Sequence, residues 1–335
     1  MGDVPRRAFG NTGLEVSALG FGAMELRGPA DGGPPLGDAE AGRLLNTVLD
    51  EGINFIDTSI DYGRSEELIG RHLGHRRSEY LLASKCGCVP GARIGSEHVH
   101  TAENIRVGIE QSLRKLRTDY LDLVQFHRSL TQDEFEAEGA LQEALAMHDE
   151  GKVRFVGVSG LFPNVEEQIR TGTFDALQVP YSIIQRAYNG VITRAAEAGL
   201  GVVVRGGAAR GVPEDWTSRS YYMVSNHAMR GIWEAAGLDD LLNGMSRLEF
   251  TLRFTLSHPG LHTAIVGTGN PDHVRSNAAA APRGALPEDV LAEVIRRLEA
   301  FEPRASQAEQ ASTPPPPERM RQGGSRTGAN GKPTE

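Results

Sequence analysis

Cysteine is scarce in this chain: its 335 residues include two, Cys86 and Cys88. A Cys-x-Cys pair is poorly placed for an unstrained disulfide, so the sequence predicts a protein of a reducing compartment, the cytoplasm. Long apolar runs are also missing, and the opening MGDVPRRAFG lacks the apolar core of a secretory signal. We therefore expect no membrane-spanning segment and no membrane partner.

An excess of positive charge is absent as well. The chain has 35 basic and 44 acidic residues and a formal net charge of −9, whereas surfaces that bind nucleic acid need a basic face. We therefore expect no nucleic-acid partner and interpret the acidity as a contribution to solubility. The 39% apolar content is that of a globular protein with a buried core.

Residues 302–335 differ in composition from the rest of the chain. They contain the run Pro314 to Pro317, a mixture of glycine, serine and arginine, and no aromatic residue. Such a segment buries too little apolar surface to offset its ordering entropy. The sequence predicts a disordered Pro/Gly/Ser-rich tail at 302–335 and one folded domain at 1–301. A ligand for a proline-binding module is the alternative interpretation of the tail.

Short apolar runs alternate with helical patterns through the folded part. The expected strands are Ala18–Phe21, Ile53–Ile56, Tyr80–Ala83, Leu121–Phe126, Val153–Val158, Ala176–Val179, Gly201–Val204 and Thr263–Val266. Most are solidly apolar, as parallel strands buried on both faces are. One amphipathic segment between them begins with an N-cap at Asp38, and another places Ile105, Ile109, Leu113 and Leu116 on one face.

Eight strands, each followed by a helix, predict an α/β fold, the (β/α)8 TIM barrel. An open doubly wound sheet is the competing layout. It usually carries a G-x-G-x-x-G turn after an early strand, and no such turn stands there. The stretch from Arg6 to Val16, centred on Asn11-Thr12-Gly13, predicts an N-terminal β-hairpin that closes the bottom of the barrel.

Polar residues follow three consecutive strands of the expected barrel. Asp57 comes directly after the second strand, with Tyr62 five residues later; Lys85 follows the third strand and His127 the fourth. The C-terminal strand ends of such a barrel form one mouth, where the chemistry sits. Each residue alone has a structural interpretation, such as a helix cap at Asp57 or a solvated loop residue at Lys85 or His127. Their order and shared position favour a common site.

These four residue types suit proton transfer to a carbonyl oxygen. A tyrosine has an ordinary pKa near ~10, which is high for a proton donor at neutral pH. The Lys85 ammonium stabilises a tyrosinate and so lowers the pKa of Tyr62, while Asp57 holds Lys85 charged and in place. His127 orients the carbonyl oxygen or assists the proton relay. The hydride must come from a cofactor, because no side chain carries one.

The chain resembles the aldo-keto reductase family from about Arg6 to about residue 300. The residues that carry the resemblance are Phe55-Ile56-Asp57-Thr58-Ser59-x-x-Tyr62-Gly63-x-Ser65-Glu66, Ala83-Ser84-Lys85, Ser112-Leu113-x-x-Leu116-x-Thr118-Asp119-Tyr120-Leu121-Asp122-Leu123 with His127, and Gly151-Lys152-Val153-Arg154-Phe155-Val156-Gly157-Val158-Ser159. The resemblance implies a catalytic tetrad of these same four polar residues, with Tyr62 as general acid. It also implies metal-free reduction of an aldehyde or ketone by NADPH or, less often, NADH.

The resemblance further implies where the cofactor lies. Ser159 and Gln178 match positions that hold the nicotinamide carboxamide, and Gly22-Ala23-Met24 match residues that lie alongside the cofactor. Gly206, Gly207, Arg210 and Gly211 match the loop that passes the pyrophosphate, a task that suits backbone amides. Gly267, Thr268 and Asn277 match the segment that binds the adenosine phosphate end.

Several positions depart from the common family pattern. Gly160 replaces an asparagine, and Arg205 replaces an aromatic residue that stacks on the nicotinamide. A guanidinium beside an oxidised, cationic ring is unfavourable, so we hypothesise that Arg205 favours the reduced cofactor. Gly267 and His273 replace a lysine and an arginine that bind the 2′-phosphate, which leaves His273 or Arg275 to supply one contact. We expect NADP(H), with NAD(H) as the alternative.

Two other functions compete with a carbonyl reductase. The resemblance also admits a cofactor-binding regulatory or redox-sensing subunit with little turnover. A metal-dependent barrel hydrolase is disfavoured, because His98 and His100 precede a helix start at Thr101 with no matching carboxylate in view. Zinc at Cys86 and Cys88 would need further ligands, so we expect no metal.

Overall fold

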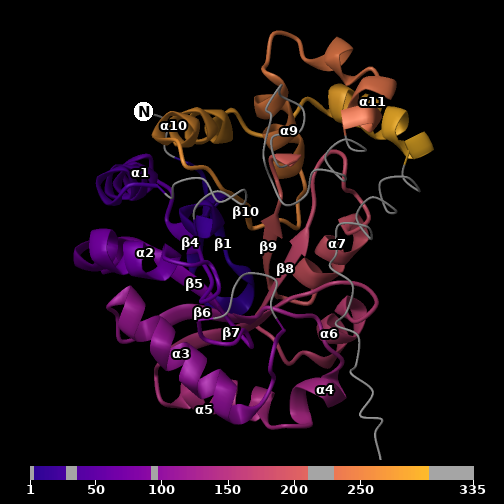
Figure 1. Ribbon diagram of the computed structural model, residues 1–335. Coiled ribbons are helices and arrows are strands. Elements are labelled where there is room, and N and C mark those ends of the chain that lie inside the picture. Colours follow the sequence, from indigo (N-terminus) through magenta and orange to yellow (C-terminus); the bar gives the residue numbers. More distant parts are fainter. Residues whose placement is uncertain (1–3, 28–35, 92–96, 210–229, 302–335) are drawn as a thin grey trace, which may run out of the picture.

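The computed structural model describes residues 4–27, 36–91, 97–209 and 230–301. Its central element is a closed barrel of eight parallel strands in the order β10-β3-β4-β5-β6-β7-β8-β9 (Figure 1). The strands are β3 (Leu19–Gly22), β4 (Phe55–Asp57), β5 (Leu81–Cys86), β6 (Leu121–Phe126), β7 (Val153–Ser159), β8 (Ala176–Pro180), β9 (Gly201–Arg205) and β10 (Thr263–Val266). The predicted (β/α)8 barrel is confirmed, and every expected strand is present within a few residues of its expected ends.

Helices surround the barrel. They are α1 (Asp38–Asp50), α2 (Ser65–Leu73), α3 (Ala102–Leu116), α4 (Gln132–Glu136), α5 (Ala140–Asp149), α6 (Val165–Thr171), α7 (Asn189–Glu197), α9 (Arg247–Leu256), α10 (Pro271–Ala280) and α11 (Glu288–Leu298). The predicted apolar face of α3 is buried. The prediction of Asp38 as an N-cap is wrong by one residue: the cap is Gly37, because its backbone N–H donates to the Glu40 carboxylate over 3.1 Å.

An N-terminal hairpin closes one end of the barrel, as predicted. Strands β1 (Arg6–Ala8) and β2 (Glu15–Ser17) pair antiparallel. Between them Phe9 is 1% exposed and packs on Phe55 at the start of β4, with ring centroids 5.8 Å apart. The Asn11 backbone N–H donates to Gly199 O just before β9 over 2.8 Å. Since the hairpin covers the N-terminal strand ends, the C-terminal ends form the open mouth.

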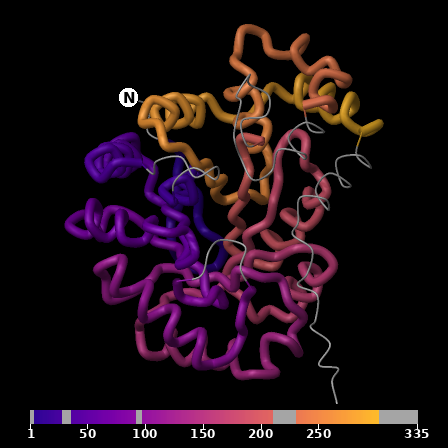
Figure 2. The backbone as a smooth tube through the Cα atoms, viewed as in Figure 1, coloured from indigo at the N-terminus to yellow at the C-terminus, as the bar shows by residue number. Residues whose placement is uncertain are grey.

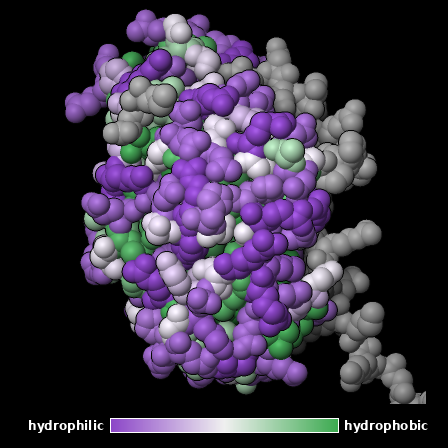
Figure 3. Space-filling model, turned by 90° about the vertical axis from the view of Figure 1, so that its left-hand side faces the viewer, coloured by the Kyte–Doolittle hydropathy of each residue, from purple (hydrophilic) through white to green (hydrophobic). Residues whose placement is uncertain are grey.

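The helical ring closes where the two ends of the domain meet. Helix α10 packs beside α1, as the orange and indigo coils of Figure 2 show. The outer face seen in Figure 3, on the side of α1, α2 and α3, is mostly hydrophilic with scattered apolar residues. None of the helices in the described ranges combines the length and apolar character that crossing a bilayer requires. The tail predicted at 302–335 lies outside the described residues.

Candidate active site

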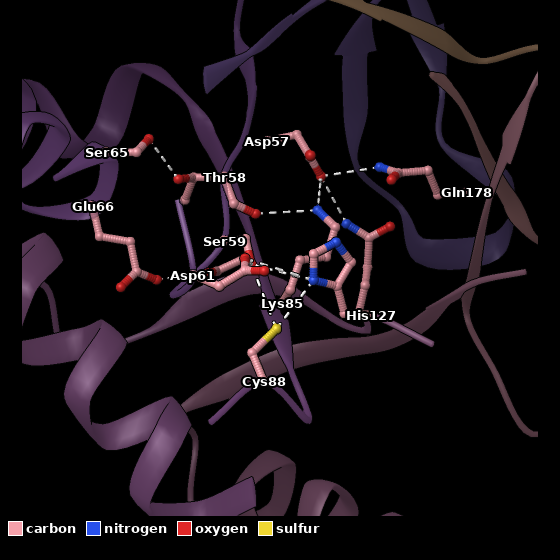
Figure 4. A network of polar contacts seen from close by, with 12 residues as sticks. Asp57, Thr58, Ser59, Asp61, Ser65, Glu66, Lys85, Cys88, His127 and Gln178 are labelled. Carbon is pink, nitrogen blue, oxygen red and sulfur yellow. Dashed lines mark hydrogen bonds and ion pairs between the residues drawn. The ribbon is translucent and has the colours of Figure 1, made fainter. Parts of the chain in front are cut away.

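A buried ion pair lies at the centre of the mouth. Lys85 Nζ donates to Asp57 Oδ2 over 2.5 Å and to the Thr58 carbonyl over 3.1 Å (Figure 4). Gln125 and Gln178 donate their Nε2 groups to the same carboxylate oxygen over 2.9 and 3.0 Å. Lys85 is 1% exposed and Asp57 2% exposed. A buried charge is tolerated when it is paired and hydrogen-bonded, and three donors satisfy this condition for Asp57.

His127 lies beside Tyr62, with ring centroids 5.9 Å apart and the rings nearly perpendicular. Its Nδ1 is 3.0 Å from Cys88 Sγ and 3.5 Å from Ser59 Oγ (Figure 4). Burial lowers the pKa of His127 to about 3, although the nearby Asp61 acts in the opposite direction, so the ring is neutral at physiological pH. Burial also raises the pKa of the Cys88 thiol, which therefore keeps its proton.

The Cys88 contact fits a neutral His127 that carries its hydrogen on Nε2. In that tautomer the protonated Cys88 thiol donates to Nδ1, which lies 3.0 Å from the sulfur. We take this tautomer for the reaction proposed below, in which His127 donates through Nε2. Sequence reasoning placed His127 at the mouth but did not predict this thiol contact.

The loop that carries Tyr62 is fixed by buried polar contacts. Thr58 Oγ1 and Ser65 Oγ lie 2.8 Å apart, and Ser65 Oγ donates to the Ala23 carbonyl over 3.0 Å. Glu66 is 1% exposed and accepts from Ser84 Oγ over 2.7 Å; burial raises the pKa of its carboxyl group. These bonds explain the Ser65-Glu66 part of the motif, because they tie the start of α2 to the residue after β3 and to β5, just beyond the loop that carries Tyr62.

The residues expected to contact a cofactor occur at several strand ends. Ser159 ends β7, Arg205 ends β9, and Gln178 lies inside β8 with its amide bound to Asp57. Gly22 ends β3, with Ala23 and Met24 in the following turn. Gly206 has a left-handed φ of 75°, and Gly207 O accepts from Thr255 Oγ1 of α9 over 2.7 Å. Arg210 and Gly211 lie outside the described residues.

Two departures from the expected family pattern lie where the surroundings of the glycine are closely packed. A Cβ at Gly160 would lie 2.6 Å from Leu177 Cδ1, which leaves little room for the usual asparagine. A Cβ at Gly267 would lie 2.9 Å from the Gly22 carbonyl oxygen, because the ends of β3 and β10 approach closely there. A lysine at position 267 would therefore require a shift of the backbone where β3 and β10 end.

The residues expected to bind the adenosine phosphate end of a cofactor lie around the start of α10. Thr268 Oγ1 and His273 Nδ1 are 3.2 Å apart. Arg275 pairs with Asp272 at 2.7 Å and with Glu51 at 3.8 Å, and its side chain is 53% exposed. Asn277 is 5% exposed on the inner side of the helix. The group thus offers exposed cationic and hydroxyl side chains near one helix N-terminus, a favourable place for a phosphate.

A second group of polar side chains lies behind His127. Ser59 Oγ donates to Asp61 Oδ1 over 2.5 Å, and Asp61 Oδ1 lies 3.7 Å from His127 Nδ1. Cys88 and His98 face each other across an isolated antiparallel bridge. One ligand-forming atom from each of Asp61, Cys88, His98 and His127 lies within 4.8 Å of all the others. The sequence indicated no carboxylate that could join His98 in a metal site. In the structure Asp61 lies close enough to His98 to do so.

We expect the fold to lose stability between about pH 7 and about pH 5. Burial lowers the pKa of His127 to about 3 and of His100 to about 4. Below about pH 6.5 these histidines bind protons in the unfolded chain but not in the folded chain. The free energy of unfolding therefore falls by up to ~1.4 kcal/mol per pH unit for each histidine. Urea unfolding at both pH values measures the decrease in the free energy of unfolding. The decrease should be smaller in His100→Gln than in the wild type.

Glu66 changes the free energy of unfolding with pH in the direction opposite to the histidines. The pH dependence of the variant must therefore be compared with that of the wild type. Its raised pKa means that the folded state binds a proton more readily than the unfolded state, which favours folding as the pH falls. An equal pH dependence in wild type and His100→Gln would contradict the assignment to the buried histidines.

Comparisons with known proteins agree with this geometry. The model of the aldo/keto reductase family matches residues 18–298. L-galactose dehydrogenase of Arabidopsis thaliana is 30% identical over 317 residues, which cover 89% of this chain and 96% of that protein. The NADH-specific methylglyoxal reductase of Escherichia coli is 25% identical over 306 residues, covering 81% of this chain and 92% of that protein. A solved aldo-keto reductase from Bacillus halodurans, in its holo form, superposes with a TM-score of 0.74 at 28% identity and covers 88% of this chain and 96% of its own.

Proposed function

Because the chain belongs to the aldo/keto reductase family, we propose that it reduces an aldehyde or ketone to an alcohol with a hydride from NAD(P)H and a proton from Tyr62. The observation that carries this proposal is the buried Lys85–Asp57 pair at the barrel mouth. A buried ammonium at the same mouth as a tyrosine and a neutral histidine is suited to a site that donates a proton to an oxygen gaining negative charge.

Each residue has a separate task in the proposed reaction. The Nε2–H of His127 donates to the carbonyl oxygen and orients it. Tyr62 transfers its phenolic proton to that oxygen as negative charge develops there, and the Lys85 ammonium stabilises the phenolate that remains. Asp57 holds Lys85 in place and is itself held by Gln125 and Gln178.

A nicotinamide cofactor, when bound, supplies the hydride that goes to the carbonyl carbon. The residues of the mouth fit such a group. Gly22 and Gly206 expose backbone without side chains, Ser159 offers a hydroxyl group, and Arg205 adds a positive charge for an anionic cofactor. We place the enzyme in the cytoplasm on the basis of its two free, buried thiols.

A panel of carbonyl compounds tests the proposed function. Oxidation of NADPH or NADH is followed by its absorbance with methylglyoxal and a nitrobenzaldehyde, and the reverse reaction is followed with L-galactose. We expect cofactor oxidation that matches alcohol formed, mole for mole. Tight cofactor binding with no turnover on the panel, together with a stoichiometric protein partner, would instead support the regulatory subunit.

We propose NADPH as the preferred cofactor, with Arg275 as the contact for its 2′-phosphate. The exposed pair with Asp272 is worth at most about 1 kcal/mol, so Arg275 exchanges it readily for a phosphate dianion. Arg275→Ala should raise the KM for NADPH about tenfold, a loss of ~1.4 kcal/mol, and leave the KM for NADH unchanged.

The control for Arg275 is Arg283→Ala, which removes another exposed arginine, one paired with Glu249. It should leave both KM values unchanged. A higher kcat/KM with NADH than with NADPH in the wild type would overturn the preference.

A further inference from the structure

His127 Nδ1, the ring nitrogen that the proposed carbonyl reduction does not use, lies within a compact set of possible metal ligands. We define this set as the four-residue cluster, which comprises Asp61, Cys88, His98 and His127. Asp61 comes from the loop after β4, Cys88 from just beyond β5, and His127 from the end of β6. We propose that the four-residue cluster is a binding site for a zinc ion.

The geometry of the cluster is close to that of a zinc site. Tetrahedral zinc has bonds of roughly 2.0–2.3 Å to nitrogen, oxygen and sulfur, so its ligand atoms lie roughly 3.2–3.8 Å apart. Here Cys88 Sγ lies 3.0 Å and Asp61 Oδ1 3.7 Å from His127 Nδ1. All four ligand atoms lie within 4.8 Å of one another, so binding a zinc ion would require only small side-chain movements.

The chemistry of the donors selects the metal. One thiolate, two imidazoles and one carboxylate suit zinc, whereas magnesium and calcium take oxygen ligands. Asp61 is 5% and Cys88 3% exposed, so the donors are held away from bulk water. Among the described residues, the buried Nε2 atom of His98 has no hydrogen-bond partner. A zinc ion that binds His98 gives this ring a strong polar partner.

Zinc and carbonyl reduction are compatible, because the two nitrogens of His127 face different tasks. Zinc takes Nδ1 and replaces the Cys88 thiol as its partner, which leaves the hydrogen on Nε2. The metal therefore requires the tautomer that the proposed reaction uses, with the hydrogen on Nε2. This consequence for His127 as a donor rests on the proposed function, whereas binding of the ion itself does not.

Binding has a proton balance that can be measured. The Cys88 thiol is protonated in the metal-free protein and must lose its proton when sulfur binds zinc. Both histidines are neutral at physiological pH and release none. Zinc binding should therefore release about one proton per chain, and the affinity should rise with pH.

The test uses the full chain after removal of metals with a chelator, and needs no carbonyl substrate. Zinc titrated by calorimetry near neutral pH should bind at one ion per chain, and cobalt should give a near-ultraviolet thiolate-to-cobalt band. Cys88→Ser and His98→Gln should each weaken zinc binding at least tenfold, and Cys88→Ser should abolish the band.

Matched controls exist for both variants. Cys86→Ser alters the other buried cysteine and His100→Gln alters the ring stacked on His98, yet neither residue belongs to the cluster. Both should bind zinc like the wild type, and circular dichroism confirms that each variant is folded. A wild type without the cobalt band, or zinc affinity unchanged by Cys88→Ser, would overturn the proposed site whether or not the protein reduces carbonyls.

Discussion

Replacing Lys85 with methionine is expected to abolish carbonyl reduction and to lower the free energy of unfolding by about 3–5 kcal/mol. The variant leaves the Asp57 carboxylate 2% exposed and without its counter-ion. Gln125 and Gln178 still donate to it, but two neutral amides stabilise a buried charge less than an ammonium does. Urea unfolding, followed by circular dichroism, measures the loss.

Two further variants separate stability from catalysis. Lys85→Met/Asp57→Asn removes both charges and should recover part of the lost stability without recovering activity. Arg194→Ala removes an exposed arginine paired with Glu166 and should cost less than about 1 kcal/mol. If Lys85→Met cost no more than Arg194→Ala, Lys85 and Asp57 would not be the coupled buried pair described above.

Replacing Tyr62 with phenylalanine is expected to lower kcat/KM for an aldehyde by about 10²–10⁴-fold, the usual contribution of a general acid. The ring and its contact with His127 are retained, so only the phenolic hydroxyl is lost. Steady-state kinetics with a nitrobenzaldehyde measure the effect. Cofactor affinity, measured by fluorescence titration, should not change.

Tyr80→Phe is the matched control for this variant. Tyr80 is 3% exposed just before β5, at the opposite end of that strand from Lys85, and its hydroxyl group has no partner among the described residues. It should keep wild-type activity. A loss in Tyr80→Phe as large as that in Tyr62→Phe would point to a general structural effect rather than to proton donation.

The barrel could be predicted because its strands are solidly apolar and its helices amphipathic. Polar residues at the strand ends then indicated the mouth, since strand order fixes which ends meet. Gln125 was missed although its signal is visible: it is a polar residue inside the apolar run of β6, and it binds Asp57. A polar residue within a buried strand is therefore worth testing for a role at the mouth.

The four-residue cluster was not predictable from spacing. Cys88 and His98 meet across an isolated antiparallel bridge, Asp61 lies in the loop after β4 and His127 follows the end of β6, so their approach depends on backbone conformation. The packing around Gly160 and Gly267 was likewise not predictable from the sequence. The sequence indicated lost cofactor contacts at these positions, whereas the structure shows backbone and side-chain packing that leaves little room for a side chain.

A single-turnover experiment tests the role of Tyr62 most directly, because it separates hydride transfer from cofactor release. The protein loaded with NADPH is mixed rapidly with excess nitrobenzaldehyde, and cofactor oxidation is followed by absorbance. We predict that the wild type oxidises one cofactor per chain, and that Tyr62→Phe, with the same cofactor affinity, does so at least about a hundredfold more slowly. Oxidation at the wild-type rate in Tyr62→Phe would contradict the account.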